Sequence, residues 1–281
     1  GGAGKTPMAI ALARSLAKRG LCVDALSRGY GRSGQAAARV RLDGRAEEFG
    51  DEPLLIARQA GVPVYVARQR YEAGVLAERE VAPGIWAVHI LDDGFQHRQL
   101  HRDIDILLLS ARDLRGRLLP AGNLREALDA VNRADVIAIP AGEPEVEAEV
   151  RARGWAGPVW RLERRMDVPA VDAPMLAFCG IARPEQFFAG LREAGVDVAA
   201  TRAFRDHHHY AQEDLNRVAE KAARCGASAL LTTEKDAVRL AGLKPALPII
   251  TVGLRTEIVD EPAVGDWLAS RVEAATRSQL R

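Results

Sequence analysis

The chain has 281 residues, of which 48% are hydrophobic and 27% charged, and its formal net charge is +1. These values are typical of a soluble globular protein with one large domain or two of moderate size, and they exclude a strongly basic nucleic-acid-binding protein. The three cysteines form no CxxC pair, which argues against a disulfide framework and a zinc knuckle and favours a reducing compartment.

The first half of the chain alternates helical and strand patterns. Residues 6–19 predict a helix that stops at Gly20, and residues 21–27 (LCVDALS) predict a buried strand. Asp51 is predicted to be the N-cap of the next helix, with Pro53 in its first turn. A short strand at 62–66, a helix at 69–80 and apolar runs at 85–91, 104–109 and 136–139 follow. Apolar runs between helices predict a parallel sheet that is covered on both faces.

Residues 140–156 are acidic and rich in Ala and Gly, and we interpret them as a domain boundary. The second half repeats the alternation, with strands predicted at 175–178, 196–203, 228–232 and 248–252 and helices at 184–194, 212–224, 234–240 and 259–275. We therefore predict an α/β protein with a larger domain (1–155) and a smaller α/β domain (156–258). The helix at 259–277 is expected to pack back on the first domain, and the active site is expected in the cleft between the two.

The first residues, GGAGKT (Gly1–Thr6), match six of the eight positions of the phosphate-binding loop GxxxxGK[ST]. In such a P-loop, backbone N–H groups at a helix N-terminus hold phosphates, the lysine contacts the β- and γ-oxygens, and the hydroxyl binds Mg²⁺. The alternative is a glycine-rich turn with a surface lysine. Because a strand usually precedes this loop, we expect the natural N-terminus to lie upstream and residues 1–281 alone to bind ATP poorly.

Asp92 and Asp93 follow an apolar run, at the position where P-loop enzymes carry an acid for Mg²⁺. The alternative is a simple Asp-Gly turn, and which of the two acids would touch the metal stays open.

His97 and His101 have the spacing of a zinc pair on a helix, but their surroundings are not helical and no third ligand is evident, so zinc is not expected.

Four further polar stretches have both a functional and a structural interpretation. One histidine of Asp206–Tyr210 could pair with a carboxylate to form a general base, or the stretch could be a solvated loop. The loop 28–32 could bind an anion or be a mobile turn, and Arg125–Glu126 could be a surface ion pair. Residues 232–236 are typical of a strand end followed by a capped helix.

Together these motifs resemble the tetraacyldisaccharide 4'-kinase (lipid A 4'-kinase) family. The matching stretches cover nearly the whole chain in the family's order: GGAGKTP (1–7), SRGYGR (27–32), GDEP (50–53), LDDGFQH (91–97), LPAGNLRE (119–126), FCGIARPEQF (178–187), FRDHHHY (204–210) and LTTEKDAVRL (231–240). Ala3, Asn123 and Ala127 depart from the family's usual residues, but none of these changes removes a charged group.

The resemblance implies a P-loop kinase that uses ATP and Mg²⁺. It would transfer the γ-phosphoryl group to the 4'-hydroxyl of a tetraacyldisaccharide 1-phosphate and form lipid IV-A in lipid A biosynthesis. The implied partner surface is the cytoplasmic face of the inner membrane of Gram-negative bacteria, and the family's hydrophobic N-terminal helix is absent from this sequence. No nucleic acid and no obligate protein partner are implied.

The resemblance also implies roles for individual residues. Asp51 would be the general base and His207 its partner, while Lys5 would contact the transferring phosphate. The phosphate loop would comprise Gly1, Gly2, Ala3, Gly4, Lys5 and Thr6. The metal set would be Thr6, Asp92, Asp93 and Glu126, and the substrate set Arg28, Tyr30, Gln96, His97 and Arg125.

Two other functions remain as alternatives on the residues alone. One is a soluble P-loop kinase for a nucleoside or another small metabolite, and the other is a nucleotide-dependent switch ATPase. Dependence of ATP turnover on the lipid acceptor distinguishes the kinase from the switch.

Overall fold

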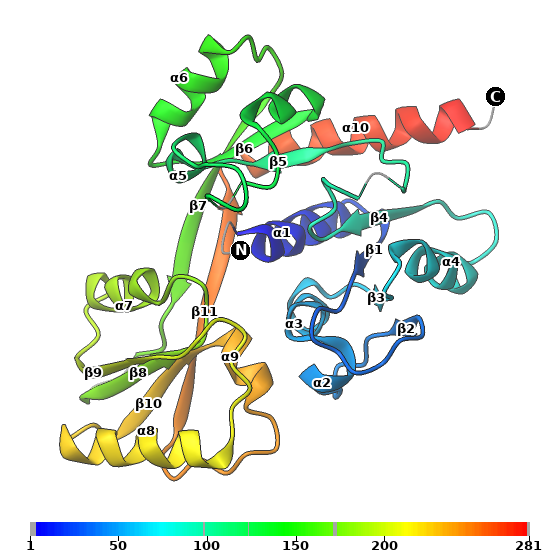
Figure 1. Ribbon diagram of the computed structural model, residues 1–281. Coiled ribbons are helices and arrows are strands. Elements are labelled where there is room, and N and C mark those ends of the chain that lie inside the picture. Colours follow the sequence, from blue (N-terminus) through cyan, green and yellow to red (C-terminus); the bar gives the residue numbers. More distant parts are fainter. Residues whose placement is uncertain (1–3, 98, 123, 171–172, 280–281) are drawn as a thin grey trace.

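The computed structural model describes residues 4–97, 99–122, 124–170 and 173–279, and these form an α/β fold (Figure 1). One sheet has four strands in the order β2-β3-β1-β4. Its strands are β1 (Cys22–Ser27), β2 (Ala38–Arg39), β3 (Val64–Val66) and β4 (Ala87–Leu91). β1 pairs in parallel with both β3 and β4, whereas the short edge strand β2 is antiparallel to β3.

The second sheet has seven strands in the order β5-β6-β7-β11-β10-β8-β9. Its strands are β5 (Ile106–Leu108), β6 (Val136–Pro140), β7 (Val159–Asp167), β8 (Met175–Cys179), β9 (Val198–Ala203), β10 (Ala229–Thr233) and β11 (Ile249–Ile258). All pairs are parallel except β7 with β11. These two long strands run between the upper lobe, with β5 and β6, and the lower lobe, with β8 to β10 (Figure 1).

The sequence analysis missed β7 and recognised only the first half of β11. The sequence of β7, VWRLERRMD, is mostly charged, and only Trp160 and Leu162 of this strand are buried. A strand with so few buried positions lacks the apolar run that marked the others. Pairing with β11 over six residue positions supplies its stability instead.

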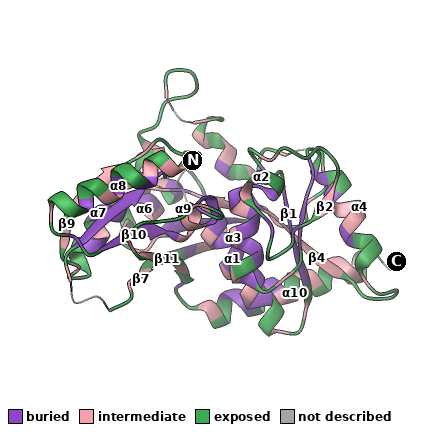
Figure 2. Ribbon diagram, turned by 90° about the horizontal axis from the view of Figure 1, so that it is seen from below, coloured by how far each residue is buried: buried purple, intermediate pink, exposed green. Residues whose placement is uncertain are grey.

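Helix α1 (Lys5–Lys18) lies at the centre of the molecule and stops before Gly20, whose φ of 80° ends a helix as predicted. Its apolar face, including Met8 and Leu16, belongs to a core that also contains β1 and α3 (Asp51–Ala60). Figure 2 shows α1 and α3 as mainly buried elements. The short helix α2 (Ala46–Phe49) leads into α3, and α4 (Arg70–Glu80) packs against β1 and β3.

The start of α3 differs from the expectation in one respect. Gly50, with φ 91°, is the N-cap residue, and Asp51 is the first helical residue rather than the cap. A Cβ on Gly50 would meet the backbone of Gly29 at 3.2 Å. The glycine therefore allows the loop after β1 to lie directly against the start of α3.

Residues 140–156, interpreted from the sequence as a domain boundary, include regular structure. They contain α6 (Pro144–Ala152), which buries Val146 and Val150 against Ile137 and Ile139 of β6. Proline at the first helical position starts this helix favourably. The neighbouring short helices are α5 (Ala111–Leu114) and the 3₁₀ helix η1 (Leu128–Arg133). Because the larger sheet continues through β7, the proposed boundary at residue 155 falls inside one sheet, and the division into domains 1–155 and 156–258 remains a proposal.

The lower lobe has helices on both faces of its strands. Met175, Ala177 and Cys179 of β8 pack with α7 (Pro184–Glu193), whereas Leu176 and Phe178 pack with α8 (Gln212–Arg224). This alternation follows from the two-residue period of a strand. The remaining helices are α9 (Glu234–Arg239) and α10 (Glu261–Gln279), of which α10 contacts α1. Among the described residues, no helix has the length and apolar character needed to cross a membrane.

Candidate active site

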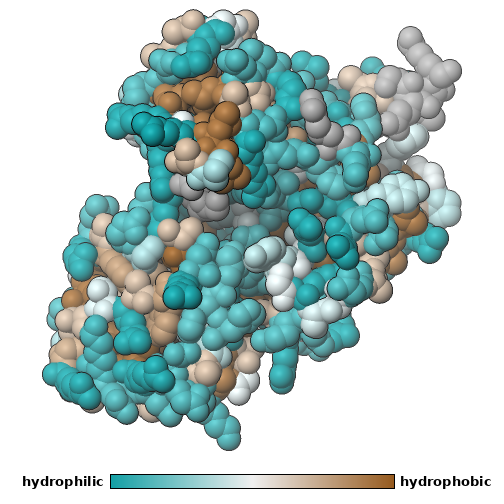
Figure 3. All heavy atoms as spheres, viewed as in Figure 1, coloured by the Kyte–Doolittle hydropathy of each residue, from teal (hydrophilic) through white to brown (hydrophobic). Residues whose placement is uncertain are grey.

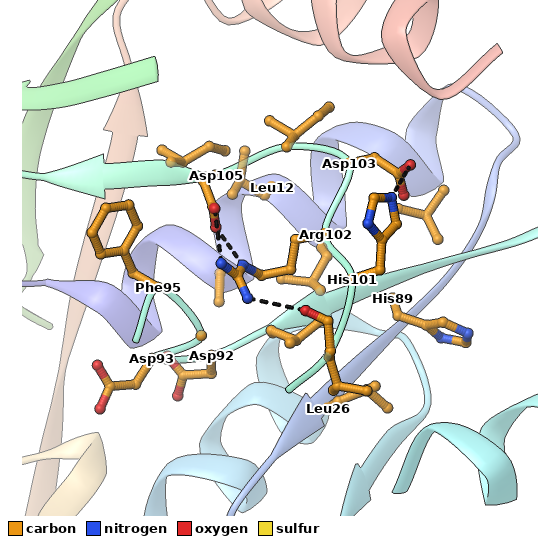
Figure 4. A pocket seen from close by; sticks show the side chains of 18 of the residues that line it. Leu12, Leu26, His89, Asp92, Asp93, Phe95, His101, Arg102, Asp103 and Asp105 are labelled. Atoms are coloured by element: carbon orange, nitrogen blue, oxygen red, sulfur yellow. Dashed lines mark hydrogen bonds and ion pairs between the residues drawn. The ribbon is translucent and has the colours of Figure 1, made fainter. Parts of the chain in front are cut away.

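A cavity of about 1000 Å³ lies beside the N-terminus of α1 and between β4 and β5. Lys5, Asp92, Asp93, Arg125 and Glu126 line it together with many apolar side chains. Figure 4 shows Asp92 and Asp93 together on one side of this pocket and His101 and Asp103 on the other. In Figure 3 the face that carries the start of α1 is mostly hydrophilic.

Two contacts join the start of α1 to the end of β4. Lys5 Nζ donates to Asp93 Oδ1 at 2.5 Å, and Thr6 Oγ1 donates to Asp92 Oδ2 at 3.2 Å. The parallel sheet explains this meeting, because the carboxyl end of β4 lies beside the N-terminus of the helix that covers it. The Lys-Thr pair and the two acids thus form one cluster, although they lie far apart in the sequence.

The turn after β4 is held in an uncommon conformation. Asp93 has φ 54°, in the left-handed region that residues other than glycine seldom adopt. Arg70 stabilises the turn, because its Nη2 donates to the carbonyl oxygens of Asp92 at 2.8 Å and Asp93 at 3.2 Å. The sequence analysis missed this buried arginine, whose only signal was its position at the start of a predicted helix.

The two acids have opposite pKa shifts. Burial, with the charges of Glu52 and Asp93, raises the pKa of Asp92 to about 6, and the hydrogen bond from Thr6 only partly opposes this. Burial also disfavours ionisation of Asp93, but the hydrogen bond and charge of Lys5, together with Arg125, outweigh it and lower its pKa. A buried carboxylate without a cationic partner is a candidate for binding a metal ion.

The Asp92→Asn substitution should therefore stabilise the fold at pH 7. The pKa of Asp92 is higher in the folded protein than in the unfolded chain, so its ionisation at neutral pH opposes folding. Removing the charge should raise the free energy of unfolding by up to about 3 kcal/mol at pH 7, and the gain should fall as the pH drops from about 6 to 4.

Urea denaturation across this pH range measures the effect, with Asp93→Asn as the matched control. The pKa of Asp93 is lowered, so its loss should destabilise the protein at pH 7. Equal destabilisation by both substitutions would contradict the assigned environment of Asp92.

The donor atoms near α1 suit Mg²⁺, which prefers oxygen ligands and is usually held by one or two protein groups in addition to phosphates. Thr6 Oγ1 and Asp92 Oδ2 lie 3.2 Å apart, and Asp93 follows Asp92 in the sequence. Glu126 lines the same cavity, but it forms an ion pair with Arg133 at 2.6 Å. The described residues contain no group of three or more acidic, histidine or cysteine side chains placed to hold a metal, so phosphates would complete the coordination.

Two of the predicted substrate residues in this half of the site, Arg125 and Gln96, are hydrogen-bonded to each other. Arg125 Nη1 lies 3.2 Å from Asp93 Oδ2 and donates to Gln96 Oε1 at 3.0 Å. Burial and the charges of Arg70, Arg102 and Arg28 lower the pKa of His97. His101 lies 3.4 Å from Asp103 and forms no metal cluster with His97 in the described part of the chain.

A second cluster joins the start of α3 to the lower lobe. His207 Nδ1 lies 3.2 Å from Asp51 Oδ2, and Tyr30 packs edge-on against the His207 ring with centroids 5.5 Å apart. His207 has φ 57°, so this residue, like Asp93, occupies the left-handed region. Arg28 is exposed on the same loop as Tyr30. The structure thus places Asp51, His207 and Tyr30, three residues named from the sequence, in contact.

Arg239 and Lys235 of α9 hold Asp51 in place, and the sequence analysis did not assign either to the site. Arg239 Nε donates to Asp51 Oδ2 at 2.8 Å, and its Nη2 contacts the same oxygen. Its Nη1 donates to the Gly180 carbonyl at 2.9 Å and to Asp236 at 3.1 Å. Lys235 Nζ lies 3.0 Å from Glu52 and 3.9 Å from Asp51. The signals in the sequence were their spacing of four residues on one helix face and their place in the family-like stretch LTTEKDAVRL (231–240).

These contacts fix the charge of Asp51. The residue is only 5% exposed, and burial by itself would raise its pKa. His207, Lys235 and Arg239 outweigh that effect and keep the pKa well below the usual range. Asp51 Oδ1 also accepts a hydrogen bond from the Glu52 amide, so both carboxylate oxygens are engaged.

Arg239→Ala should strongly destabilise the protein. The substitution would leave Asp51 and Asp236 buried without their shared cation, and breaking a buried pair in this way typically costs about 3–5 kcal/mol. Chemical denaturation at pH 7 measures the loss. Arg224→Ala on the exposed face of α8 is the control, with an expected effect below about 1 kcal/mol. Similar stability of the two variants would contradict the structural role of Arg239.

Part of the predicted phosphate loop lies outside the described residues. Gly1, Gly2 and Ala3 lie outside the described residues, as does Asn123, so only Gly4, Lys5 and Thr6 represent the phosphate loop here. Thr233, at the end of β10, caps α9 by accepting a hydrogen bond from the Asp236 amide, as the pattern predicted.

Comparison with known proteins agrees with the resemblance found in the sequence. The family model described as tetraacyldisaccharide-1-P 4'-kinase matches residues 1–273. A tetraacyldisaccharide 4'-kinase from Koribacter versatilis is 40% identical over 284 residues, covering 97% of this chain and 86% of that protein. One from Geobacter metallireducens is 41% identical over 276 residues, covering 89% of this chain and 78% of that protein.

A solved structure is also similar. The crystal structure of LpxK from Aquifex aeolicus in complex with ATP superposes with a TM-score of 0.72 at 31% sequence identity. The match covers 96% of this chain and 85% of that one. The expected P-loop kinase type of α/β fold is therefore confirmed.

Proposed function

Because this chain belongs to the tetraacyldisaccharide 4'-kinase family, we propose that it transfers the γ-phosphoryl group of ATP to the 4'-hydroxyl of a tetraacyldisaccharide 1-phosphate. The product is lipid IV-A, an intermediate of lipid A biosynthesis. The observation that carries the assignment is the cluster of Lys5, Thr6, Asp92 and Asp93 at the N-terminus of α1. Such a cluster is what a P-loop kinase needs to bind a nucleotide with its Mg²⁺.

At the phosphate end, Gly4, Lys5 and Thr6 bind the nucleotide. Lys5 exchanges its ion pair with Asp93 for the β- and γ-phosphate oxygens, and the N-terminus of α1 adds its partial positive charge. Thr6 and Asp92 would hold Mg²⁺, with Asp93 and Glu126 as further candidates, and the ion would supply positive charge opposite the transferring group. Arg125, Gln96 and His97 line the acceptor side, together with Arg28 and Tyr30.

At the acceptor end, Asp51 and His207 act as one base unit. A sugar hydroxyl is a weak acid, so the proton leaves mainly as the new bond to phosphorus forms. Asp51 is buried and both its oxygens accept hydrogen bonds, whereas the His207 side chain is 31% exposed. Asp51 therefore orients His207, and the imidazole of His207 receives the proton while Asp51 stays ionised. Lys235 Nζ lies 3.4 Å from His207 Nε2, so the acceptor hydroxyl would displace it to reach that nitrogen.

The two members of the base unit come from different parts of the fold. Asp51 lies on α3, and His207 and α9 belong to the lower lobe, which β7 and β11 join to the upper one (Figure 1). Closure of the lobes over both substrates completes the site and excludes water from the phosphoryl group. The acceptor is an acylated lipid, so the enzyme works at a membrane surface, for which we propose the cytoplasmic face of the inner membrane.

A phosphotransfer assay tests the function directly. The protein, ATP labelled at the γ-phosphate, Mg²⁺ and the tetraacyldisaccharide 1-phosphate should yield labelled lipid, and ATP turnover should depend on the acceptor. ATP hydrolysis at the same rate without acceptor would indicate a switch ATPase. Transfer to a nucleoside but not to the lipid would indicate a small-metabolite kinase.

A further inference from the structure

A small crevice beside the N-terminus of α1 contains two arginines that have no role in the site described so far. Its volume is about 30 Å³, and Gly4, Ser110, Pro140, Arg164 and Arg183 are among its lining residues. A Cβ on Gly4 would lie 3.4 Å from Arg164 Nη2. The guanidinium of Arg164 thus lies against the backbone that leads into Lys5 and Thr6.

Neither arginine has a carboxylate partner among the described residues. The hydrogen bond that Arg164 makes is to a neutral group, Gln186 Oε1, at 3.3 Å. Arg183 Nε is buried and has no hydrogen-bond partner in the described part of the chain. Two acids lie near the crevice, but Glu143 accepts from the Ala111 amide and Asp113 from Ser110. Buried polar groups are normally paired, so an unpaired guanidinium atom here requires an explanation.

The charge of Arg183 also lies close enough to disfavour the charge of Arg164. Burial, followed by the charge of Arg183, lowers the pKa of Arg164, and Glu143 only partly opposes this. Like charges held together without a carboxylate are typical of a site that binds an anion, and planar guanidinium groups suit phosphate oxygens in particular.

We propose that Arg164 and Arg183 bind a phosphate group of the nucleotide, on the side of the phosphate loop that faces β7 and α7. The proposal rests on the proposed kinase function. The crevice shares Leu108, Leu109 and Asp113 with the large cavity that contains Lys5, so a nucleotide bound there can extend one group into it. It is far smaller than that cavity, so a sugar ring or a base does not fit, and only oxygens of a phosphate group could reach the two guanidinium groups.

The two arginines belong to different parts of the fold, so a phosphate bound by both would also affect how the lobes are arranged. Arg164 belongs to β7, one of the two long strands between the lobes, and Arg183 is the N-cap residue of α7 in the lower lobe. A phosphate held by both would connect the nucleotide to the lower lobe. Nucleotide binding would then favour the closed arrangement of the lobes that phosphoryl transfer needs.

Equilibrium binding of ATP and ADP to Arg164→Gln and Arg183→Gln tests the proposal. Each substitution removes charge-assisted hydrogen bonds and should weaken nucleotide binding about tenfold to a hundredfold. Arg164→Lys should retain more affinity than Arg164→Gln because the charge remains. Arg165→Gln is the matched control, since Arg165 is the next residue of β7 and pairs with Glu257 at 2.9 Å instead. Its nucleotide affinity should stay within about twofold of the wild type.

Steady-state kinetics with the lipid acceptor distinguish the two possible sources of phosphate. The KM for ATP should rise in both glutamine variants, and the KM for the acceptor should not change. A rise in the acceptor KM alone would assign the arginines to the acceptor's 1-phosphate and overturn the proposal, as would unchanged nucleotide binding in correctly folded variants. If the wild type transfers no phosphate to the lipid, the proposed function fails, while the binding measurements still test the arginines.

Discussion

The Asp51→Asn enzyme is expected to bind ATP normally and to lose about 10²–10⁴-fold in kcat. Asn keeps the size of the side chain but cannot stabilise a charged His207, and removal of an acid–base group typically costs this much. The position lies at the start of α3, away from Lys5 and Thr6, so nucleotide affinity should be retained. Single-turnover transfer to the lipid acceptor, together with equilibrium ATP binding, measures both quantities.

Two further variants show whether Asp51 acts through His207. His207→Gln should lower kcat about as much as Asp51→Asn, and the double variant should be little worse than either, because residues that act as one unit are not additive. His208→Gln is the control, since His208 pairs with Asp214 at 2.9 Å and stacks on Phe204. Near-wild-type turnover of Asp51→Asn would remove Asp51 from the base unit.

Lys5→Ala is expected to lower kcat/KM by about 10³-fold or more. The ammonium group of Lys5 would neutralise the charge that develops on the transferring phosphoryl group, and a preorganised charge of this kind is worth about 10²–10³-fold or more in mutagenesis. The loss should appear with saturating ATP as well, because the contact strengthens in the transition state. Initial rates over a range of ATP concentrations separate the kcat and KM effects.

Lys18→Ala is the matched control for this prediction. Lys18 lies in the last turn of the same helix and is exposed, so its removal should leave the rate within about twofold of the wild type. Full activity of Lys5→Ala would exclude the phosphate-loop function of residues 1–6.

Most of the regular structure could be predicted from the sequence, for local reasons. The helix over α1 carries a continuous apolar face and a glycine stop, and the strands that became β1, β6, β8 and β10 are apolar runs. These signals depend only on neighbouring residues. The omissions arose where neighbouring residues give no such signal: β7 is mostly charged and is stabilised by its pairing with β11, and the acidic sequence of α6 was not recognised as a helix.

The sequence by itself determined the chemical groups of this protein: a phosphate loop, paired acids after a strand, and motifs in the order of one kinase family. Only the tertiary structure decided which groups meet. It places Lys5 on Asp93, His207 on Asp51, and Arg239 between Asp51 and Asp236. Arg70 and Arg164 stood in no recognised pattern, and Arg183 was assigned no role although it lies in the family-like stretch FCGIARPEQF. In an arginine-rich chain, only the surroundings of an arginine show what it binds. Such contacts join segments that are distant in the sequence. Burial at these contacts changes the pKa of each charged group, and a local sequence pattern contains no information about burial.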